Sequence, residues 1–311
     1  MMDGVIVIDK QAGMTSHDVV NAVRKTLGIK KAGHTGTLDP LATGVLPVCL
    51  NEATKLAGFL TGDDKEYRAT LLLGVKTDTM DTEGKIISQS DTFVSGEAVK
   101  SVISRMTGKI KQVPPAYSAV KYCGKPLYKW ARGGVFLDLE PREVTIYSIV
   151  VEEISLPRVT FRVVCSKGTY IRSLCSDIGD ALGVGACLCG LRRLQSGIFT
   201  EGMAVILSDY AGTDKKEALA KKILPMAGLL PLLATIELED NCAAKLRNGW
   251  QPSVEMMKEY DLPLLKAGDM VKFISRGCLL AVAEMLAPVN NLSGLDGKTQ
   301  LARIVRVFNY Q

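Results

Sequence analysis

The backbone conformation is most restricted by sequence in residues 33–44, GHTGTLDPLATG. Gly or Pro occupies four of these twelve positions, and three threonines stand between them. Because Gly favours turns and Pro interrupts helices and strands, the stretch predicts a constrained loop. It carries Asp39 and His34, the latter one of only two histidines in the chain. We therefore expect a carboxylate and an imidazole that are held at fixed positions.

Segments with helical and strand periodicity surround this loop. TSHDVVNAVRKTLG predicts a helix that Thr15 or Ser16 caps and Gly28 ends. Further helices are predicted around NEATKLAGFL, in SGEAVKSVISRMTG and in KGTYIRSLCSDIGDALG, where Tyr170 and Arg172 are expected at an exposed helix mouth. GVIVIDK, KEYRATLLLGV, REVTIYSIVVEEI and RVTFRVVCS read as strands. This mixture indicates an α+β chain.

The pattern changes near residue 236. Short apolar runs, MVKFIS, CLLAVAEML and LARIVRVF, are separated by turns rich in Gly, Asn, Asp and Pro. A length of 311 residues suits two domains better than one. We therefore predict one domain over residues 1–235 and a small β-rich domain over residues 236–311.

Composition narrows the classes of partner. The net charge of +5 permits a polyanionic partner without requiring one. No apolar run approaches the roughly 18 residues that span a bilayer, and Asp3 in the N-terminal stretch argues against a signal peptide. The eight cysteines form no C-x-x-C pair, so a zinc site is poorly supported. We expect no membrane contact, no metal and a reducing cytoplasm.

Several catalytic and cofactor motifs are missing from the sequence. It has no G-x-x-x-x-G-K-[ST] and no G-x-S-x-G, and GVGACLCG lacks the spacing of a dinucleotide loop. Carboxylates therefore remain as candidates. Asp39 either caps a turn before Pro40 or stands at an open cleft as nucleophile or base. His34 is likewise either a satisfied loop residue or a substrate contact.

A basic and aromatic segment, KQVPPAYSAVKYCGKPLYKWARGG, stands out in the middle of the chain. Cations that alternate with aromatic rings suit phosphate neutralisation and base stacking. The other reading is a solvated loop whose lysine stems cover apolar surface. The segment contains Lys111, Tyr117, Lys121, Tyr122, Lys125, Tyr128, Lys129, Trp130 and Arg132.

GHTGTLDPLATGVLPVCLNEATKL resembles the signature of the bacterial tRNA pseudouridine-55 synthases of the TruB family. The resemblance continues, in family order, through KEYRATLLLGVKTDTMDTEG, QVPPAYSAVKYCGKPLYKWARGG, CSKGTYIRSLCSDIGDALG and LRRLQSGIF. It implies a mixed, mainly antiparallel sheet with flanking helices, and an RNA-contacting insertion over about residues 111–145. From IELEDNCAAKLRNGWQP onward the chain resembles a PUA-like RNA-binding domain. Candidate phosphate contacts there are Lys245, Arg247, Lys272, Arg276, Arg303 and Arg306.

The resemblance implies isomerisation of uridine to pseudouridine at position 55 in the T-loop of tRNA. This reaction breaks an N–C bond, forms a C–C bond and needs no cofactor. Asp39 corresponds to the nucleophile, which attacks either the sugar or the base. Arg172 corresponds to the arginine that pairs with this carboxylate and keeps it ionised. Tyr67 corresponds to the tyrosine that stacks on the target base and helps to move its proton.

Four further residues are assigned to substrate binding by the same resemblance. His34 corresponds to the histidine that enters the T-loop where the target base is extruded. Tyr170 corresponds to a second tyrosine beside that base. Lys10 of KQAGMTS and Leu191 of LRRLQSGIF complete the set.

The sequence departs from the family pattern at two positions. Gln11 replaces the proline of the first motif, and Leu194 stands where many relatives have threonine. We expect a slightly less stiff loop at Gln11 and unaltered chemistry.

Three alternatives remain to be weighed. A non-catalytic protein that binds and refolds tRNA would have no use for Asp39 together with Arg172. A glycoside hydrolase would need a second carboxylate, from Asp78, Asp81 or Glu83. A guide-RNA-dependent relative would lack the bacterial type of insertion. We therefore expect a monomer that binds the T-arm and acceptor stem of tRNA without guide RNA.

Overall fold

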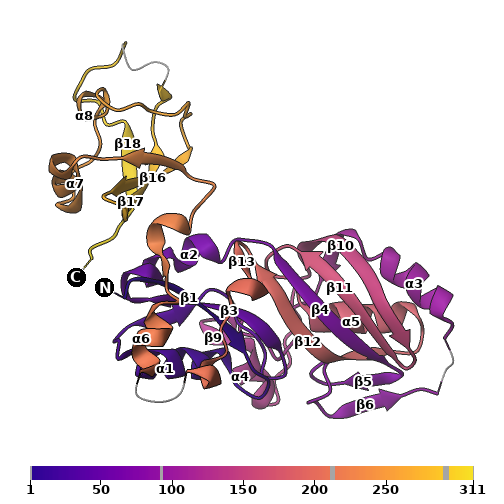
Figure 1. Ribbon diagram of the computed structural model, residues 1–311. Coiled ribbons are helices and arrows are strands. Elements are labelled where there is room, and N and C mark those ends of the chain that lie inside the picture. Colours follow the sequence, from indigo (N-terminus) through magenta and orange to yellow (C-terminus); the bar gives the residue numbers. More distant parts are fainter. Residues whose placement is uncertain (1, 92–93, 211–213, 290–293, 311) are drawn as a thin grey trace.

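Most strands of the chain lie in one mixed sheet (Figure 1). The computed structural model describes residues 2–91, 94–210, 214–289 and 294–310. Within the sheet the strand order is β14 (Leu224–Pro225), β1 (Gly4–Lys10), β3 (Thr43–Leu50), β12 (Ala186–Ser196), β4 (Lys65–Leu73), β11 (Arg158–Cys165), β10 (Arg142–Ser155) and β7 (Gly108–Gln112). β2 (Ala32–His34) joins β3, and β13 (Phe199–Thr200) joins β12. Only β3 and β12 pair in parallel in this sheet, which confirms the predicted mainly antiparallel architecture.

Helices flank the sheet and close its core. α1 (Ser16–Leu27) begins at a capping box between Thr15 and Asp18, and Gly28 ends it in the left-handed conformation at φ 66°. α3 (Gly96–Ser104) and α5 (Ile171–Ala181) contribute buried side chains to the same hydrophobic core as strand β4. The predicted helix around residues 51–60 is two short pieces, a 3-10 helix η1 (Asn51–Leu56) and α2 (Ala57–Leu60). The remaining short helices are α6 (Lys215–Ala220), η2 (Glu201–Met203), η3 (Leu207–Asp209) and η4 (Met226–Gly228).

Two excursions leave the main sheet. The first is a hairpin of β5 (Val75–Thr77) and β6 (Ile86–Gln89). The second holds β8 (Lys121–Tyr122), β9 (Lys125–Pro126) and α4 (Leu127–Arg132). Because β7 and β10 both belong to the main sheet, this second excursion covers residues 113–141 and is shorter than the predicted 111–145.

The C-terminal residues build a second, four-stranded sheet in the order β15 (Ala234–Glu237), β16 (Met270–Ser275), β17 (Cys278–Met285) and β18 (Ala302–Val307). With α7 (Asp240–Arg247) and α8 (Val254–Met257) it encloses its own hydrophobic core. A separate apolar cluster joins this unit to the first, because Leu279, Val282 and Phe308 pack with Val5 and Val7 of β1. The unit lies at one end of the molecule, and both chain ends are found at this junction (Figure 1).

Lys272 belongs to this junction, which corrects one sequence-based expectation. Its side chain is buried, and its Nζ donates hydrogen bonds of 3.0 Å to the carbonyls of Ala227 and Leu230. A lysine fixed in this way has no free ammonium for a phosphate. The helices in the described parts of the chain include none that is long and apolar enough to cross a membrane.

Candidate active site

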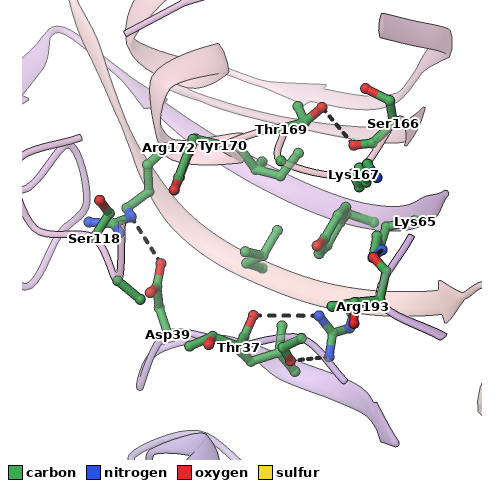
Figure 2. Close-up of a pocket in the computed structure, with 18 of the residues that line it drawn as sticks. Thr37, Asp39, Lys65, Ser118, Ser166, Lys167, Thr169, Tyr170, Arg172 and Arg193 are labelled. Atoms are coloured by element: carbon green, nitrogen blue, oxygen red, sulfur yellow. Dashed lines mark hydrogen bonds and ion pairs between the residues drawn. The ribbon is translucent and has the colours of Figure 1, made fainter. Parts of the chain in front are cut away.

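A cavity of about 260 Å³ opens between the loop of residues 35–39, the strands β4 and β12, and the turn that leads into α5 (Figure 2). Ser118 and Ala119 of the second excursion close another side. Among the described residues that line the cavity, Asp39 is the only one with a carboxylate. The loop that the sequence singled out therefore forms one wall of a pocket.

Buried polar side chains hold this loop in place. Lys10 on β1 is fully buried, and its Nζ donates to the carbonyls of Gln11 (2.9 Å), Pro40 (3.1 Å) and Ala42 (2.6 Å). Ser16 Oγ accepts from the amide of Leu38 at 2.8 Å and contacts its carbonyl oxygen at 3.0 Å. The backbone on both sides of Asp39 is thus fixed from α1 and β1, so the loop has the constraint that its glycines and proline predict.

Lys10 does not line the cavity, contrary to its assignment to substrate binding. Burial lowers the pKa of its ammonium to about 8, although the negative charge of Asp39 opposes that effect. Lys10 donates to three backbone carbonyls and therefore stabilises the loop instead of binding a ligand.

Asp39 is paired with a buried arginine. Arg172 Nε lies 2.9 Å from Asp39 Oδ2, and the Arg172 side chain is only 6% exposed. Arg172 Nη1 donates to the carbonyl of Thr79 (3.0 Å) and Nη2 to that of Tyr117 (2.9 Å), so the guanidinium has one fixed orientation. The expected exposed position of Arg172 at the helix mouth is wrong, because the second excursion covers this end of α5.

The pKa of the Asp39 carboxyl reflects opposing effects. Burial raises it, the charge of Arg172 lowers it, and the nearby carboxylate of Asp81 raises it again, with a net rise above the ordinary value. A carboxylate that is partly desolvated and held by one cation is more nucleophilic than a solvated one. It remains accessible to a ligand, because the Asp39 side chain is 34% exposed to the cavity.

Asp81 is a member of this network whose role the sequence did not reveal. Its Oδ2 lies 3.6 Å from Arg172 Nη1, and its Oδ1 accepts from Thr79 Oγ1 (2.6 Å) and the amide of Glu83 (3.1 Å). Asp81 is buried outside the cavity wall. It therefore holds Arg172 from the side away from the cavity, and their contact joins two quoted blocks that lie far apart in the sequence.

The glycoside hydrolase hypothesis is inconsistent with this geometry. Two carboxylates must flank the substrate in such enzymes. Asp78, Asp81 and Glu83 are all absent from the described cavity wall, where Asp39 stands alone.

Tyr67, Tyr170 and Leu191 all line the cavity. Tyr67 comes from the core-facing side of β4, and burial raises the pKa of its phenol above the ordinary value. The backbone of Tyr170 is clamped by the side-chain amide of Gln112, which accepts from the Tyr170 amide at 3.0 Å and donates to its carbonyl at 3.3 Å. Leu191 belongs to β12 and pairs with Ala69 of β4.

His34 lies next to the cavity wall without being part of it. It is the last residue of β2, pairs with Val48 of β3 and is half-buried. Burial and the charge of Arg193 lower the pKa of its imidazole, so the ring is neutral near pH 7. Its Nδ1 is buried and makes no hydrogen bond within the described structure.

Arg193 also lines the cavity, and sequence reasoning passed over it (Figure 2). In LRRLQSGIF two arginines stand side by side, and only the alternation of β12 separates them. Arg192 turns outward to ion pairs with Asp9 and Glu201, whereas Arg193 turns inward and is 1% exposed. In the described parts of the chain, no three His, Cys, Asp or Glu side chains converge as metal ligands would.

Two solved structures contain chains that share this fold. An H/ACA RNP bound to a substrate RNA containing 2'-deoxyuridine includes a chain that is 30% identical, with a TM-score of 0.75 over 99% of this chain and 86% of that one. A Cbf5-Nop10-Gar1 complex includes one that is 32% identical, with a TM-score of 0.75 over 99% and 85%. Similarity over nearly the whole chain shows that these proteins have the same fold, and the family model described as a pseudouridylate synthase gives its class.

Sequence comparison narrows this class to one family. The profile described as TruB family pseudouridylate synthase (N terminal domain) matches residues 24–171, and that of the tRNA pseudouridylate synthase B C-terminal domain matches residues 172–230. Proteins named tRNA pseudouridine synthase B are 52% identical in Syntrophus aciditrophicus (99% of both chains) and 45% identical in Geotalea uraniireducens (99% of this chain and 98% of the relative). The chain belongs to the TruB family of pseudouridylate synthases and is an enzyme.

Proposed function

We propose that this enzyme isomerises uridine to pseudouridine at position 55 in the T-loop of tRNA, with Asp39 as the nucleophile. One observation supports the assignment of Asp39 above the others: it is the single carboxylate of the described cavity wall and is ion-paired with a buried arginine. The names of the relatives support tRNA as the substrate.

The chemistry requires no external electron or group donor. The bond between N1 of uracil and C1′ of ribose breaks, a bond from C5 to C1′ forms, C5 loses its proton and N1 gains one. Asp39 adds to the sugar or to the ring, which frees the base to rotate before the new bond forms. Arg172 keeps Asp39 ionised and aimed at the cavity throughout.

The size of the cavity implies that the target base is extruded from the RNA. A volume of about 260 Å³ suits one nucleobase with its sugar and excludes a stacked loop. Tyr67, Tyr170 and Leu191 then provide flat and apolar surfaces on which the ring stacks. We propose that His34 enters the space which the base leaves, because it directly precedes Thr35 of the cavity wall.

The second excursion supports a substrate that is bound without guide RNA. Ser118 and Ala119 belong to the cavity wall, and Lys125 lies 4.3 Å from the centre of the Trp130 ring. Segment 113–141 thus contributes to the cavity wall and carries cations stacked on aromatic rings, which suit contacts with RNA from within the chain. We further propose a monomer that works in the cytoplasm, where its eight unpaired thiols are stable.

A protein that only refolds tRNA remains the second candidate, although no observation favours it. RNA binding would leave the Asp39–Arg172–Asp81 network without a purpose, and burying three charges is costly.

Incubation with an unmodified tRNA transcript tests the proposal. Carbodiimide labelling and primer extension should map a single pseudouridine at position 55 without added cofactor or guide RNA. A transcript with cytidine at that position is the control and should remain unmodified. Binding without any pseudouridine would favour the refolding protein, and modification at another position would contradict the assignment of the substrate site.

A further inference from the structure

Arg193 carries a buried charge that has no carboxylate partner. Its Nε donates to the carbonyl of Val45 (2.7 Å), Nη2 to that of Gly36 (3.1 Å) and Nη1 to that of Thr37 (3.5 Å) (Figure 2). No carboxylate among the described residues lies within 4.0 Å of this guanidinium. Arg172 is buried to a similar degree and has both Asp39 and Asp81 at ion-pair distance.

Burying a cation without a counter-charge costs free energy, so such a cation is expected where its positive charge stabilises an anionic group. Three carbonyl oxygens satisfy part of the hydrogen-bonding capacity of Arg193, yet its full positive charge remains at the cavity wall. An arginine that served only to fix the loop could be paired with a carboxylate, as Arg192 is with Asp9. The lack of one indicates that an anionic group beside Arg193 arises during the reaction.

The sheet register identifies that group. Arg193 of β12 stands directly opposite Tyr67 of β4, and both side chains line the cavity. Side chains of such a cross-strand pair lie about 5 Å apart at their Cβ atoms. Burial raises the pKa of the Tyr67 phenol, the Arg193 charge lowers it, and the Cys165 thiol and the Asp39 carboxylate raise it. Arg193 is therefore the one nearby group that favours the phenolate.

We propose that Arg193 is a positioning residue which stabilises the phenolate of Tyr67, so that the Tyr67 oxygen accepts the proton from C5 of the target uracil. The inference rests on the proposed function for the identity of that proton. When C5 has bonded to C1′, the C5–H bond breaks and its electron pair restores the ring double bond. The proton passes to the Tyr67 oxygen and then to water, while N1 takes a proton from water, so the reaction remains an isomerisation.

Direct titration of the Tyr67 phenol tests the proposal without reference to activity. Protein labelled with 3-fluorotyrosine gives one fluorine resonance for each tyrosine, and Tyr67→Phe identifies the relevant signal. Arg193→Met should raise the phenol pKa by about one to two units, as expected for a charge removed from a few ångströms. Arg193→Lys keeps the charge and should remain close to the wild type. Arg192→Met removes the adjacent, outward arginine and should leave the titration unchanged.

The pH dependence of single-turnover proton release from C5 gives the second readout. Below the phenol pKa the phenolate fraction rises about tenfold for each pH unit. Arg193→Met should therefore lose about 10- to 100-fold at neutral pH and recover as the pH rises, because its rate profile is displaced upward. In a Tyr67→Phe background the same substitution should cost nothing further.

Each outcome bears on the proposal. An unchanged phenol pKa in folded Arg193→Met, or an equal loss of rate at every pH that persists without the Tyr67 hydroxyl, would show that Arg193 only holds the loop. Arg193→Gln retains amide donors for the carbonyls and gives the same comparison should Arg193→Met fail to fold. Absence of wild-type turnover would count against the proposed function, whereas the titration would still decide the role of Arg193.

Discussion

Asp39 and Arg172 lie 133 positions apart in the sequence and meet at 2.9 Å in the cavity. Neither residue has its role by type alone: a solvated aspartate is a weak nucleophile, and an exposed arginine orients nothing. Burial raises the pKa of the carboxyl, and the charge of the Arg172 guanidinium opposes that rise. Removing the Asp39 carboxylate and removing the Arg172 guanidinium should therefore have different consequences.

We predict that Arg172→Ala nearly abolishes turnover. Breaking a buried ion pair costs about 3–5 kcal/mol, which corresponds to a rate loss of roughly 10²- to 10⁴-fold if the loss falls on the reactive state. Without the cation the pKa of Asp39 rises further, so the acid limb of the rate profile should move to higher pH. Single-turnover rates across pH measure both effects. Arg162→Ala removes an exposed arginine of β11 and should have little effect.

Tyr67 is expected to act through both its ring and its hydroxyl. Tyr67→Phe keeps the stacking face and loses the proton acceptor, whereas Tyr67→Ala loses both. We expect severe impairment in Phe and a further loss of binding in Ala, measured by single-turnover rate and hairpin affinity. Tyr147→Phe, at a half-exposed ring of β10, is the control. Wild-type rates in Tyr67→Phe would disprove the proton-transfer role.

At the scale of single residues, the sequence predicts the residues to which a family motif assigns a role. It does not predict the residues that act by contacting them. Asp39, Tyr67 and Arg172 have roles that the family resemblance assigns, whereas Asp81 and Arg193 stand in the quoted blocks KEYRATLLLGVKTDTMDTEG and LRRLQSGIF without an assigned role. Their contacts come from the fold, because Asp81 approaches Arg172 from the β5–β6 excursion and Arg193 stands opposite Tyr67 on the adjacent strand. Such contacts depend on strand register, which a single sequence does not specify.

Among the elements, those with local signals agree with the sequence-based expectation. The N-cap of α1 at Thr15 and the alternation of β4 are readable within about ten residues, and both are found as expected. The β5–β6 hairpin has no such signal: β6 is exposed throughout and offers no buried face to detect. The helix predicted around residues 51–60 begins as a 3-10 helix at Asn51, which has a positive φ of 47°.

The loop of residues 33–44 allows a prediction for its last residue, Gly44. Gly44 has a φ of 98°, and a Cβ there would lie 2.2 Å from the carbonyl oxygen of Arg193. Gly44→Ala should therefore destabilise the protein by about 2 kcal/mol or more, through backbone strain and displacement of β12. Gly33→Ala, in the same segment with open space around its Cβ, is the matched control. Thermal unfolding and turnover measure the difference; equal midpoints would show that the loop is less constrained than described.

At the scale of the whole molecule, β1 joins the two units. Ile6 and Ile8 belong to the hydrophobic core of the main sheet, whereas Val5 and Val7 pack with Leu279 of the C-terminal unit. The unbroken apolar run VIVI is the sequence signal for a strand that is buried on both faces. What covers its second face cannot be read from that run. The arrangement also means that removal of residues 236–311 would expose apolar surface and disturb the catalytic unit.

Substituting charged residues on the C-terminal unit therefore tests its contact with tRNA more specifically than truncation does. Arg247 and Arg306 are exposed and have no acidic partner among the described residues, whereas Arg276 and Arg303 are paired with Asp240 and Glu284. If this unit contacts the acceptor stem, changing Arg247 and Arg306 to Gln should weaken binding of whole tRNA and lower the salt slope by about one for each lost contact.

An isolated T-arm hairpin and the chemical step should be unaffected by those two changes. The paired arginines, Arg276 and Arg303, provide the control substitutions, with a smaller expected effect. Equal losses on hairpin and whole tRNA would contradict the acceptor-stem contact.

The most direct test of the account compares the wild type with Asp39→Asn on the same T-arm hairpin. Asn preserves the size of the side chain and an oxygen acceptor for Arg172, so the variant should fold and bind the hairpin with nearly unchanged affinity. It lacks a nucleophilic carboxylate, so release of tritium from C5-labelled uridine should fall to background while the wild type converts the substrate fully. Near-normal turnover by Asp39→Asn would contradict the central claim that this carboxylate performs the chemistry.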